Sequence, residues 1–131
     1  MMELPIHLSK DSREPIYHQV ENQLKALIAA NHLHAGTLLP SIRVLAKDLE
    51  VSVITIRRAY QNLEYQGFIQ TLQGKGTFVA EIEKKLKNKV KTTSVYETFE
   101  KAVETAMNYD YTIEEIEEIF QEVLAAHKKG D

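Results

Sequence analysis

The chain has 131 residues, contains no Cys and carries a formal net charge of −3. This length corresponds to one compact domain, or to one domain with an appendage. The absence of Cys excludes disulfides, thiolate metal sites and Cys nucleophiles. Neither end shows a signal-peptide pattern, and no apolar run approaches the roughly 20 residues that span a bilayer. We therefore expect a soluble, cytoplasmic protein.

The charge is distributed unevenly along the chain. Residues 1–80 hold eight Lys and Arg against seven Asp and Glu, a net of +1, whereas residues 81–131 hold eight against twelve, a net of −4. This change of composition predicts a domain over residues 1–80 and a helical segment over residues 81–131. A net of +1 is far below the strongly basic character typical of a DNA-binding domain. Binding to DNA would therefore depend on where individual cationic side chains lie.

The spacing of apolar residues predicts a first helix over residues 14–30. Ile16, Val20 and Leu24 recur every four residues, which places them on one helical face. Pro15 suits the first turn, because its missing N–H would have no partner there. The helix is amphipathic, so we expect it to pack against a core.

Two further helices are predicted close together after a short extended segment at residues 37–39. Ser41 is a favoured N-cap for a helix that ends near Glu50, and Ser52 is a favoured N-cap for a second helix that ends at Gly67. A turn of about three residues between two helices is typical of a helix-turn-helix, although the frequent Gly is absent from this turn. In that motif the second helix enters the major groove of DNA.

A β-hairpin is predicted directly after these helices. Apolar and β-branched runs at residues 68–72 and 77–79 flank a Gln-Gly-Lys-Gly turn at residues 73–76. Such a turn is often only a surface hairpin, but after a helix-turn-helix its Lys75 is placed to reach a phosphate or the minor groove. The predicted fold class is therefore mainly α with a small β-hairpin wing, that is, a winged helix-turn-helix followed by a C-terminal helical segment.

The second of the paired helices begins with groups that suit DNA recognition. Ser52 and Thr55 can bond a phosphate or a base, and Ile54 can pack on a thymine methyl group. Arg57 can make a forked contact with guanine or with a phosphate. Arg43 begins the preceding helix, where a phosphate contact is expected.

Arg58 points roughly one hundred degrees away from Arg57 on a helix, which makes it the weaker candidate. For both side chains the alternative is a solvated charge on the helix surface. The residues predicted to contact DNA are Ser41, Arg43, Ser52, Val53, Ile54, Thr55, Arg57, Arg58, Gln73, Gly74, Lys75 and Gly76.

Residues 81–131 have a strongly helical composition, and two helices are predicted there. Capping-box spacings at Ser94 with Glu97 and at Thr112 with Glu115 predict a start or kink near residue 94 and a firmer start at residue 112. The run of five Lys between residues 84 and 91 is interpreted as a solvated helix face.

Apolar residues recur at helical spacing through this segment and form more apolar surface than two helices can bury alone. We expect this surface to form a homodimer, with packing against the N-terminal domain as the alternative. The residues assigned to dimerisation are Val95, Phe99, Val103, Met107, Ile113, Ile116, Phe120, Val123 and Leu124.

One ordered set of motifs covers about residues 10–80. It consists of Pro15-Ile16-Tyr17 with Gln19, Gly36, Leu39-Pro40-Ser41, Arg43-Val44-Leu45-Ala46, Val51-Ser52, Thr55-Ile56-Arg57, Ala59-Tyr60, Leu63-Glu64, Gly67 and Gly74-Lys75-Gly76-Thr77-Phe78-Val79. This set resembles the N-terminal domain of GntR-type bacterial transcription regulators. The resemblance implies DNA contacts from Arg43, Ser52, Thr55, Arg57 and the wing at residues 74–76.

Two positions depart from the pattern of that family. Position 53 is commonly polar or basic in GntR-type regulators but is Val53 here, and Ile54 also lacks a polar group. The departure implies a more apolar reading of bases and a different operator.

The short helical tail resembles the YtrA-like subfamily of these regulators. That resemblance implies two helices that make a homodimer, and frequent control of genes for membrane transporters. We therefore expect a transcription regulator, a repressor, that binds double-stranded palindromic operator DNA as a homodimer. The sequence identifies no small-molecule effector, and no cofactor or metal is expected.

An enzyme is the main alternative class, and its best candidates for catalytic or metal-binding residues are the five His. They lack metal-ligand spacing, and only His32 and His34 are close enough for a weak metal or effector site. Ser41 and Ser52 lack the context of a nucleophile elbow, and the Gly-Lys-Gly turn is too short for a phosphate loop. A third class is a protein-interaction module with an acidic tail, which would lack salt-dependent binding to a DNA duplex.

Overall fold

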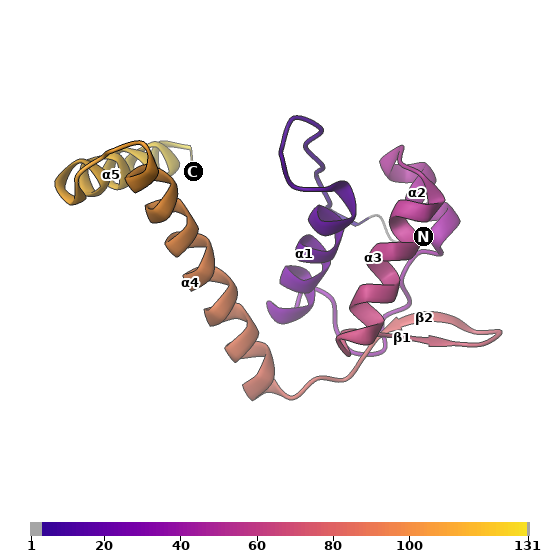
Figure 1. The fold of residues 1–131 in the computed structure, drawn as a ribbon. Coiled ribbons are helices and arrows are strands. Elements are labelled where there is room, and N and C mark those ends of the chain that lie inside the picture. The colour runs from indigo at the N-terminus through magenta and orange to yellow at the C-terminus, as the bar shows by residue number, and fades with distance from the viewer. Residues whose placement is uncertain (1–3, 131) are drawn as a thin grey trace. The chain divides into compact units, whose positions relative to one another are not determined.

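The structure, a computed structural model, describes residues 4–130. The chain forms two compact units, here called the N-terminal unit, up to Lys91, and the C-terminal unit, from Thr92. The division predicted after residue 80 from composition stays a prediction. The elements are α1 (Ile16–Ala29), α2 (Ile42–Leu49), α3 (Val53–Tyr65), β1 (Ile69–Leu72), β2 (Gly76–Val79), α4 (Lys84–Asn108) and α5 (Ile113–Lys129), as labelled in Figure 1. The predicted class, mainly α with a β-hairpin wing, is confirmed.

The core of the N-terminal unit is built from the apolar faces that predicted its helices. Val20, Leu24 and Ile28 of α1 are fully buried, and Ile56 and Leu63 of α3 lie in the same cluster. Burial of each such side chain stabilises the fold by roughly 1.5–3 kcal/mol. The three helices are thereby held around one core.

The paired helices α2 and α3 begin at the predicted caps. The Ser41 hydroxyl accepts the Val44 amide at 3.2 Å, and the Ser52 hydroxyl accepts the Thr55 amide at 3.1 Å. Residues 50–52 form the turn, in which Glu50 adopts a left-handed φ of 56°. Glycine adopts this conformation most easily, so Glu50 stands where helix-turn-helix turns often carry Gly.

A buried phenol ties α3 to the start of α2. The Tyr60 hydroxyl donates a 2.7 Å hydrogen bond to the Pro40 carbonyl, one residue before the cap of α2. Burial raises the pKa of Tyr60, because the low-polarity surroundings disfavour the phenolate. This bond joins the two helices of the motif at a fixed point.

The hairpin pairs β1 with β2 in antiparallel register and is extended by a third segment. Leu38 forms a bridge with Phe78, and the backbone amide of Leu39 donates to the carbonyl of Thr77 at 2.8 Å. The segment predicted as extended before Pro40 therefore lies along β2. Gly76 has a φ of +120°, and a Cβ there would lie 2.9 Å from Leu38 Cδ1, so a side chain at this position is disfavoured.

The segment before α1, for which no element was predicted, is part of the same core. Leu4 and Ile6 are 8% and 6% exposed, and Leu8 packs beside the core cluster. Apolar residues at every second position are typical of an extended chain with one buried face. We call residues 4–9 the N-terminal arm.

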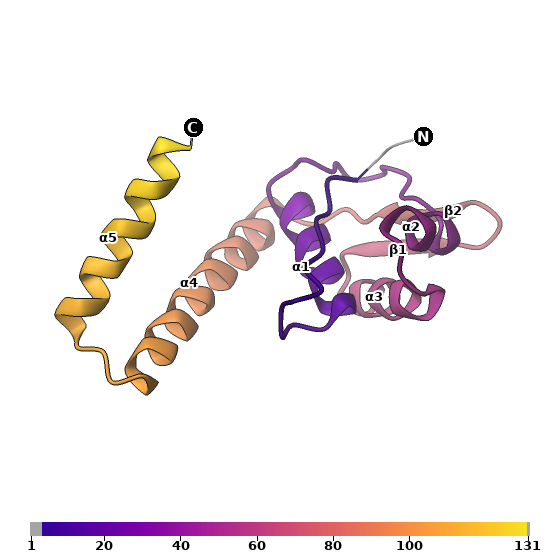
Figure 2. The ribbon, with the colours of Figure 1, turned by 90° about the horizontal axis from the view of Figure 1, so that it is seen from above.

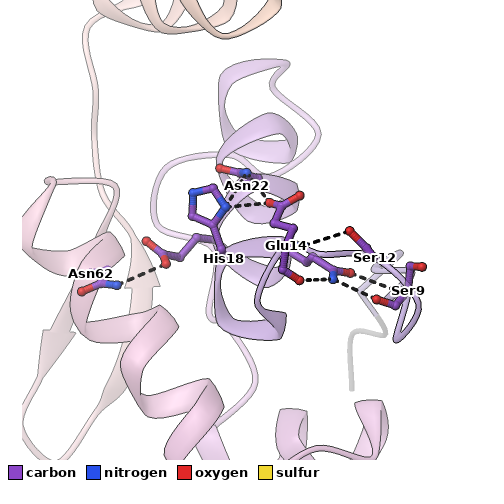
Figure 3. Close-up of polar contacts among 8 residues, drawn as sticks. Ser9, Ser12, Glu14, His18, Asn22 and Asn62 are labelled. Carbon is purple, nitrogen blue, oxygen red and sulfur yellow. Dashed lines mark hydrogen bonds and ion pairs between the residues drawn. The ribbon is translucent and has the colours of Figure 1, made fainter. Parts of the chain in front are cut away.

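Two glutamines of α1 hold the backbone of this arm. The Gln23 side-chain amide accepts the His7 N–H at 2.8 Å and donates to the His7 carbonyl at 2.7 Å. The buried Gln19 accepts the Ser9 N–H at 2.8 Å and donates to the Ser9 carbonyl at 2.9 Å; part of this network is drawn in Figure 3. Each side-chain amide thus bonds both the backbone N–H and the carbonyl of one arm residue, as a neighbouring β-strand would do.

Helix α4 runs without a break over Lys84–Asn108, so the predicted start or kink near Ser94 is wrong. The Ser94 carbonyl accepts a 2.9 Å hydrogen bond from the Thr98 hydroxyl within the helix. No Pro or Gly interrupts residues 84–108, and a capping-box spacing without a helix breaker does not end a helix.

The lysine run is not wholly a solvated face. Lys87 is buried, and its Nζ donates to Asn31 Oδ1 at 2.9 Å, just beyond the end of α1. Val90 packs beside the core of the N-terminal unit. The other four lysines of the run are exposed, as interpreted. The first turns of α4 therefore belong to the N-terminal unit.

The C-terminal unit pairs the rest of α4 with α5. Thr112 and Glu115 form the predicted capping box at the start of α5. The rings of Phe99 and Phe120 meet edge to face, with centroids 5.5 Å apart. None of the α5 residues is buried, so the helices leave their apolar stripes open to solvent. Among the described residues, no helix is long and apolar enough to cross a membrane.

Candidate nucleic-acid interface

The helix-turn-helix and the hairpin lie together in the N-terminal unit. Figures 1 and 2 show α2, α3 and the hairpin on one side of α1, with the hairpin loop extending outward. The buried residues of α3, including Ile56 and Leu63, face the core, which leaves the opposite face of α3 to solvent. Of the predicted DNA-reading residues, Ile54, Arg57 and Arg58 are exposed on α3.

The first two turns of α3 present an apolar and a cationic group. Ile54 is 74% exposed, and Arg57 is exposed one turn later. Val53, predicted at the same face, is half-buried and packs against the core. It therefore offers less surface to a ligand than Ile54 does. Within these two turns of α3 the exposed side chains are those of Ile54, Arg57 and Arg58.

The hydroxyl groups at the start of α3 are already engaged with each other. The Ser52 and Thr55 hydroxyls lie 2.7 Å apart, while Ser52 also caps the helix. Each oxygen has capacity for a further bond, because a hydroxyl has one donor and two acceptor sites. Ser52 can contact a phosphate or base while it caps the helix, and Thr55 can do so while it stays bonded to Ser52.

Among the described residues, the cations of this surface have no acidic partner. Between residues 4 and 130, no Lys or Arg nitrogen lies within 4.0 Å of a carboxylate oxygen, and the one such contact of a basic side chain joins His18 Nδ1 to Glu14 Oε1. Arg43 in the first turn of α2, Arg57 in α3 and Lys75 in the hairpin loop are all exposed and unpaired there. Exposed cations without an acidic partner are suited to binding phosphates.

Arg58 lies on the aromatic ring of Tyr17 from α1. Its guanidinium carbon is 3.9 Å from the ring centroid, which is a close cation–π contact. Sequence spacing alone does not predict this contact, because it depends on how α1 packs against α3.

Gln61 is also exposed on α3 and was absent from the predicted set. Its position opposite the buried stripe of α3 could have been predicted from helical periodicity.

The wing is held at both edges. Along β2 it pairs with the segment before α2, and on the β1 side the Thr71 amide donates to Glu64 Oε2 of α3 at 2.9 Å. The loop at residues 73–75 is exposed, with Gly74 at a φ of 80° and Lys75 beside it. Glu64 therefore links the wing directly to α3, a role that its sequence position did not reveal.

The histidines do not gather into a site. Within residues 4–130 there is no group of three or more His, Asp or Glu positioned to hold a metal ion. His32 and His34 are exposed in the turn after α1. His18 lies 2.7 Å from Glu14, which also accepts from Asn22 (Figure 3).

These features define a DNA-binding winged helix-turn-helix protein. The model described as bacterial regulatory proteins, gntR family, matches residues 16–79. The chain is 32% identical to the HTH-type transcriptional repressor YtrA of Bacillus subtilis, over 95% of this chain and 96% of that protein. The chain therefore belongs to the GntR family of bacterial transcription regulators, and it is of the YtrA-like type. Members of this family regulate transcription and are not enzymes.

Solved structures agree with this assignment. A GntR family transcriptional regulator from Listeria monocytogenes matches with a TM-score of 0.69 and 28% identity, covering 86% of this chain and 97% of that one. The DNA-binding domain of AraR in complex with operator ORE1 matches with a TM-score of 0.50 and 31% identity, covering 59% of this chain and 94% of that one. The first match extends over both units, and the second concerns a DNA-binding domain.

Proposed function

We propose that this chain is a cytoplasmic, sequence-specific transcription repressor that binds a palindromic operator as a homodimer. The observation that carries the proposal is the exposed start of α3, which presents Ile54 and Arg57, together with the exposed Lys75 in the loop of the wing; within residues 4–130 neither cation has an acidic partner. The AraR domain solved with its operator supports a DNA ligand for this type of fold, and the repressor YtrA supports the sign of regulation.

Each side chain has a distinct role in this proposal. Ile54 packs on a thymine methyl group, and Arg57 makes a forked contact with guanine. Arg43 and Lys75 bind phosphates on either side and fix the register of the protein on the duplex. The wing glycines allow the backbone to approach DNA closely. The remaining residues proposed to contact DNA are Ser41, Ser52, Val53, Thr55, Arg58, Gln73, Gly74 and Gly76.

The dimer in this proposal forms through the C-terminal unit. Its apolar side chains at the predicted dimerisation positions are largely exposed in one chain, for example Val95 at 52% and Phe120 at 41%. Exposed apolar surface on this scale favours a protein partner. A two-fold dimer places two copies of α3 on two half-sites, which compensates for the low net charge of each N-terminal unit. The resemblance to the YtrA-like subfamily extends the proposal to genes for membrane transporters.

The test is selection of bound fragments from random-sequence duplex DNA by the purified protein. We expect an enriched palindrome, with half-sites separated by about one helical turn or a multiple of it. Affinity for the enriched duplex should fall with salt at a log–log slope of about −0.9 for each phosphate contacted. Absence of enrichment together with a flat salt dependence would contradict the proposal and favour a protein-interaction module.

A further inference from the structure

The stack of Arg58 on Tyr17 suggests a part of the DNA-binding surface that lies between α1 and α3. Arg58 is exposed in the second turn of α3, and its guanidinium carbon lies 3.9 Å from the centre of the Tyr17 ring. Tyr17 is half-buried and packs against the core, so its ring is fixed by its surroundings. A mobile cationic side chain is thus held against an immobile surface.

The chemistry of the stack leaves the cation available to an anion. A guanidinium carries five N–H donors at the edge of a planar group, and its contact with Tyr17 occupies one flat face only. No carboxylate within residues 4–130 lies within 4.0 Å of Arg58. The charge therefore remains uncompensated, while its donors point along the plane of the group.

The position of Arg58 favours a phosphate over a base. In a helix-turn-helix the N-terminal residues of the second helix reach the base edges, and here Ile54 and Arg57 occupy that place. Tyr17 draws Arg58 toward α1, beside the part of α3 that enters the groove. The backbone of a duplex lies on either side of its groove, so a cation held there meets phosphate oxygens.

We propose that Arg58 binds a backbone phosphate and that Tyr17 is its positioning residue, holding the guanidinium in the binding orientation before DNA arrives. This proposal rests on the proposed DNA-binding function and adds Tyr17 to it. Ordering a flexible side chain on binding costs about 0.5–1.5 kcal/mol. Loss of the ordering surface should therefore weaken binding by roughly two- to twelvefold, since 1.4 kcal/mol corresponds to a factor of ten.

A double-mutant cycle tests the link between the two residues. The probe is the duplex enriched by the protein from random-sequence DNA, with a shuffled duplex of equal length beside it. The variants are Tyr17→Leu, Tyr17→Phe, Arg58→Gln and the double variant Tyr17→Leu/Arg58→Gln. Tyr65→Leu is the matched control, because Tyr65 is a tyrosine of the same unit, at the end of α3, that is 94% exposed. Thermal unfolding of every variant shows that the folded protein is being compared.

We expect Tyr17→Leu to weaken binding to both duplexes, and Tyr17→Phe and Tyr65→Leu to leave it within about twofold of the unchanged protein. Arg58→Gln should reduce the log–log salt slope by about 0.9. In the Arg58→Gln background, Tyr17→Leu should have no further effect, because the side chain that it positions is absent.

Three results would overturn the inference while leaving the proposed function intact. The first is an equal effect of Tyr17→Leu with and without Arg58, which indicates a purely structural role for the ring. The second is an unchanged salt slope in Arg58→Gln. The third is a loss confined to one altered base pair, which indicates a base contact. If the unchanged protein itself enriches no duplex and shows no salt dependence, the result refutes the proposed DNA-binding function, on which this inference rests.

Discussion

Replacement of Tyr60 by Phe removes one hydrogen bond from the centre of the helix-turn-helix and little else. The Tyr60 side chain is 4% exposed, and Phe fills nearly the same volume, so no cavity forms. The lost group is the hydroxyl that donates to the Pro40 carbonyl at 2.7 Å. Pro40 is buried, and a buried acceptor left without its donor costs about 1–3 kcal/mol. We expect Tyr60→Phe to lower the free energy of unfolding by that amount at neutral pH.

The pH dependence of this difference follows from the raised pKa of Tyr60. Burial disfavours the phenolate, so the folded protein keeps the phenol neutral at a pH where the unfolded chain ionises it. The stabilisation is complete below the unfolded pKa of about 10 and is lost as the pH rises above it. The advantage of Tyr over Phe should then shrink by up to about 1.4 kcal/mol for each pH unit.

The assay is urea unfolding of both proteins at a series of pH values from about 7 to 11. Groups common to the two proteins cancel in the difference, which isolates Tyr60. Equal stability of the two proteins at neutral pH would refute the importance of the bond to Pro40. A stability difference that stays constant above the unfolded pKa of Tyr would refute the burial argument.

Three further substitutions test the proposed roles. Arg57→Ala should cost about 1–3 kcal/mol on the enriched duplex and relax base discrimination, measured by titration against single-base variants; unchanged preference would contradict base reading. Lys75→Ala should weaken binding equally on enriched and shuffled duplexes and reduce the salt slope by about 0.9, whereas a loss at one base pair would contradict a phosphate contact. Val95→Glu should convert the proposed dimer to a monomer in sedimentation, and Thr93→Glu, at an exposed position, is the control for the added charge; a persistent dimer would exclude this face from the interface.

The features that depend on local chemistry were predictable from the sequence. Ser41, Ser52 and Thr112 cap helices through hydrogen bonds to residues three positions along the chain, so their spacing is enough to predict them. The hairpin followed from the Gly-rich turn between β-branched runs. The buried faces of α1 and α3 followed from apolar periodicity.

The contacts that join distant segments were not predictable in this way. Tyr17 meets Arg58, and Glu64 meets the wing, only after helices and hairpin have packed together. Lys87 looked like one more surface charge, because nothing in a lysine run indicates that one member reaches Asn31. The break predicted near Ser94 failed for a related reason: a capping pattern is local, whereas an uninterrupted helix needs the absence of breakers over many residues.

The N-terminal arm has a consequence for anyone who isolates the DNA-binding domain. The family match covers residues 16–79, yet Leu4 and Ile6 lie in the core and the arm is held by two side-chain amides of α1. A fragment cut at the limits of the match would expose the apolar surface that these residues cover and leave both amides without their partners. The family match is therefore shorter than the folded unit, and an expressed domain should begin before Leu4 and extend through Val90.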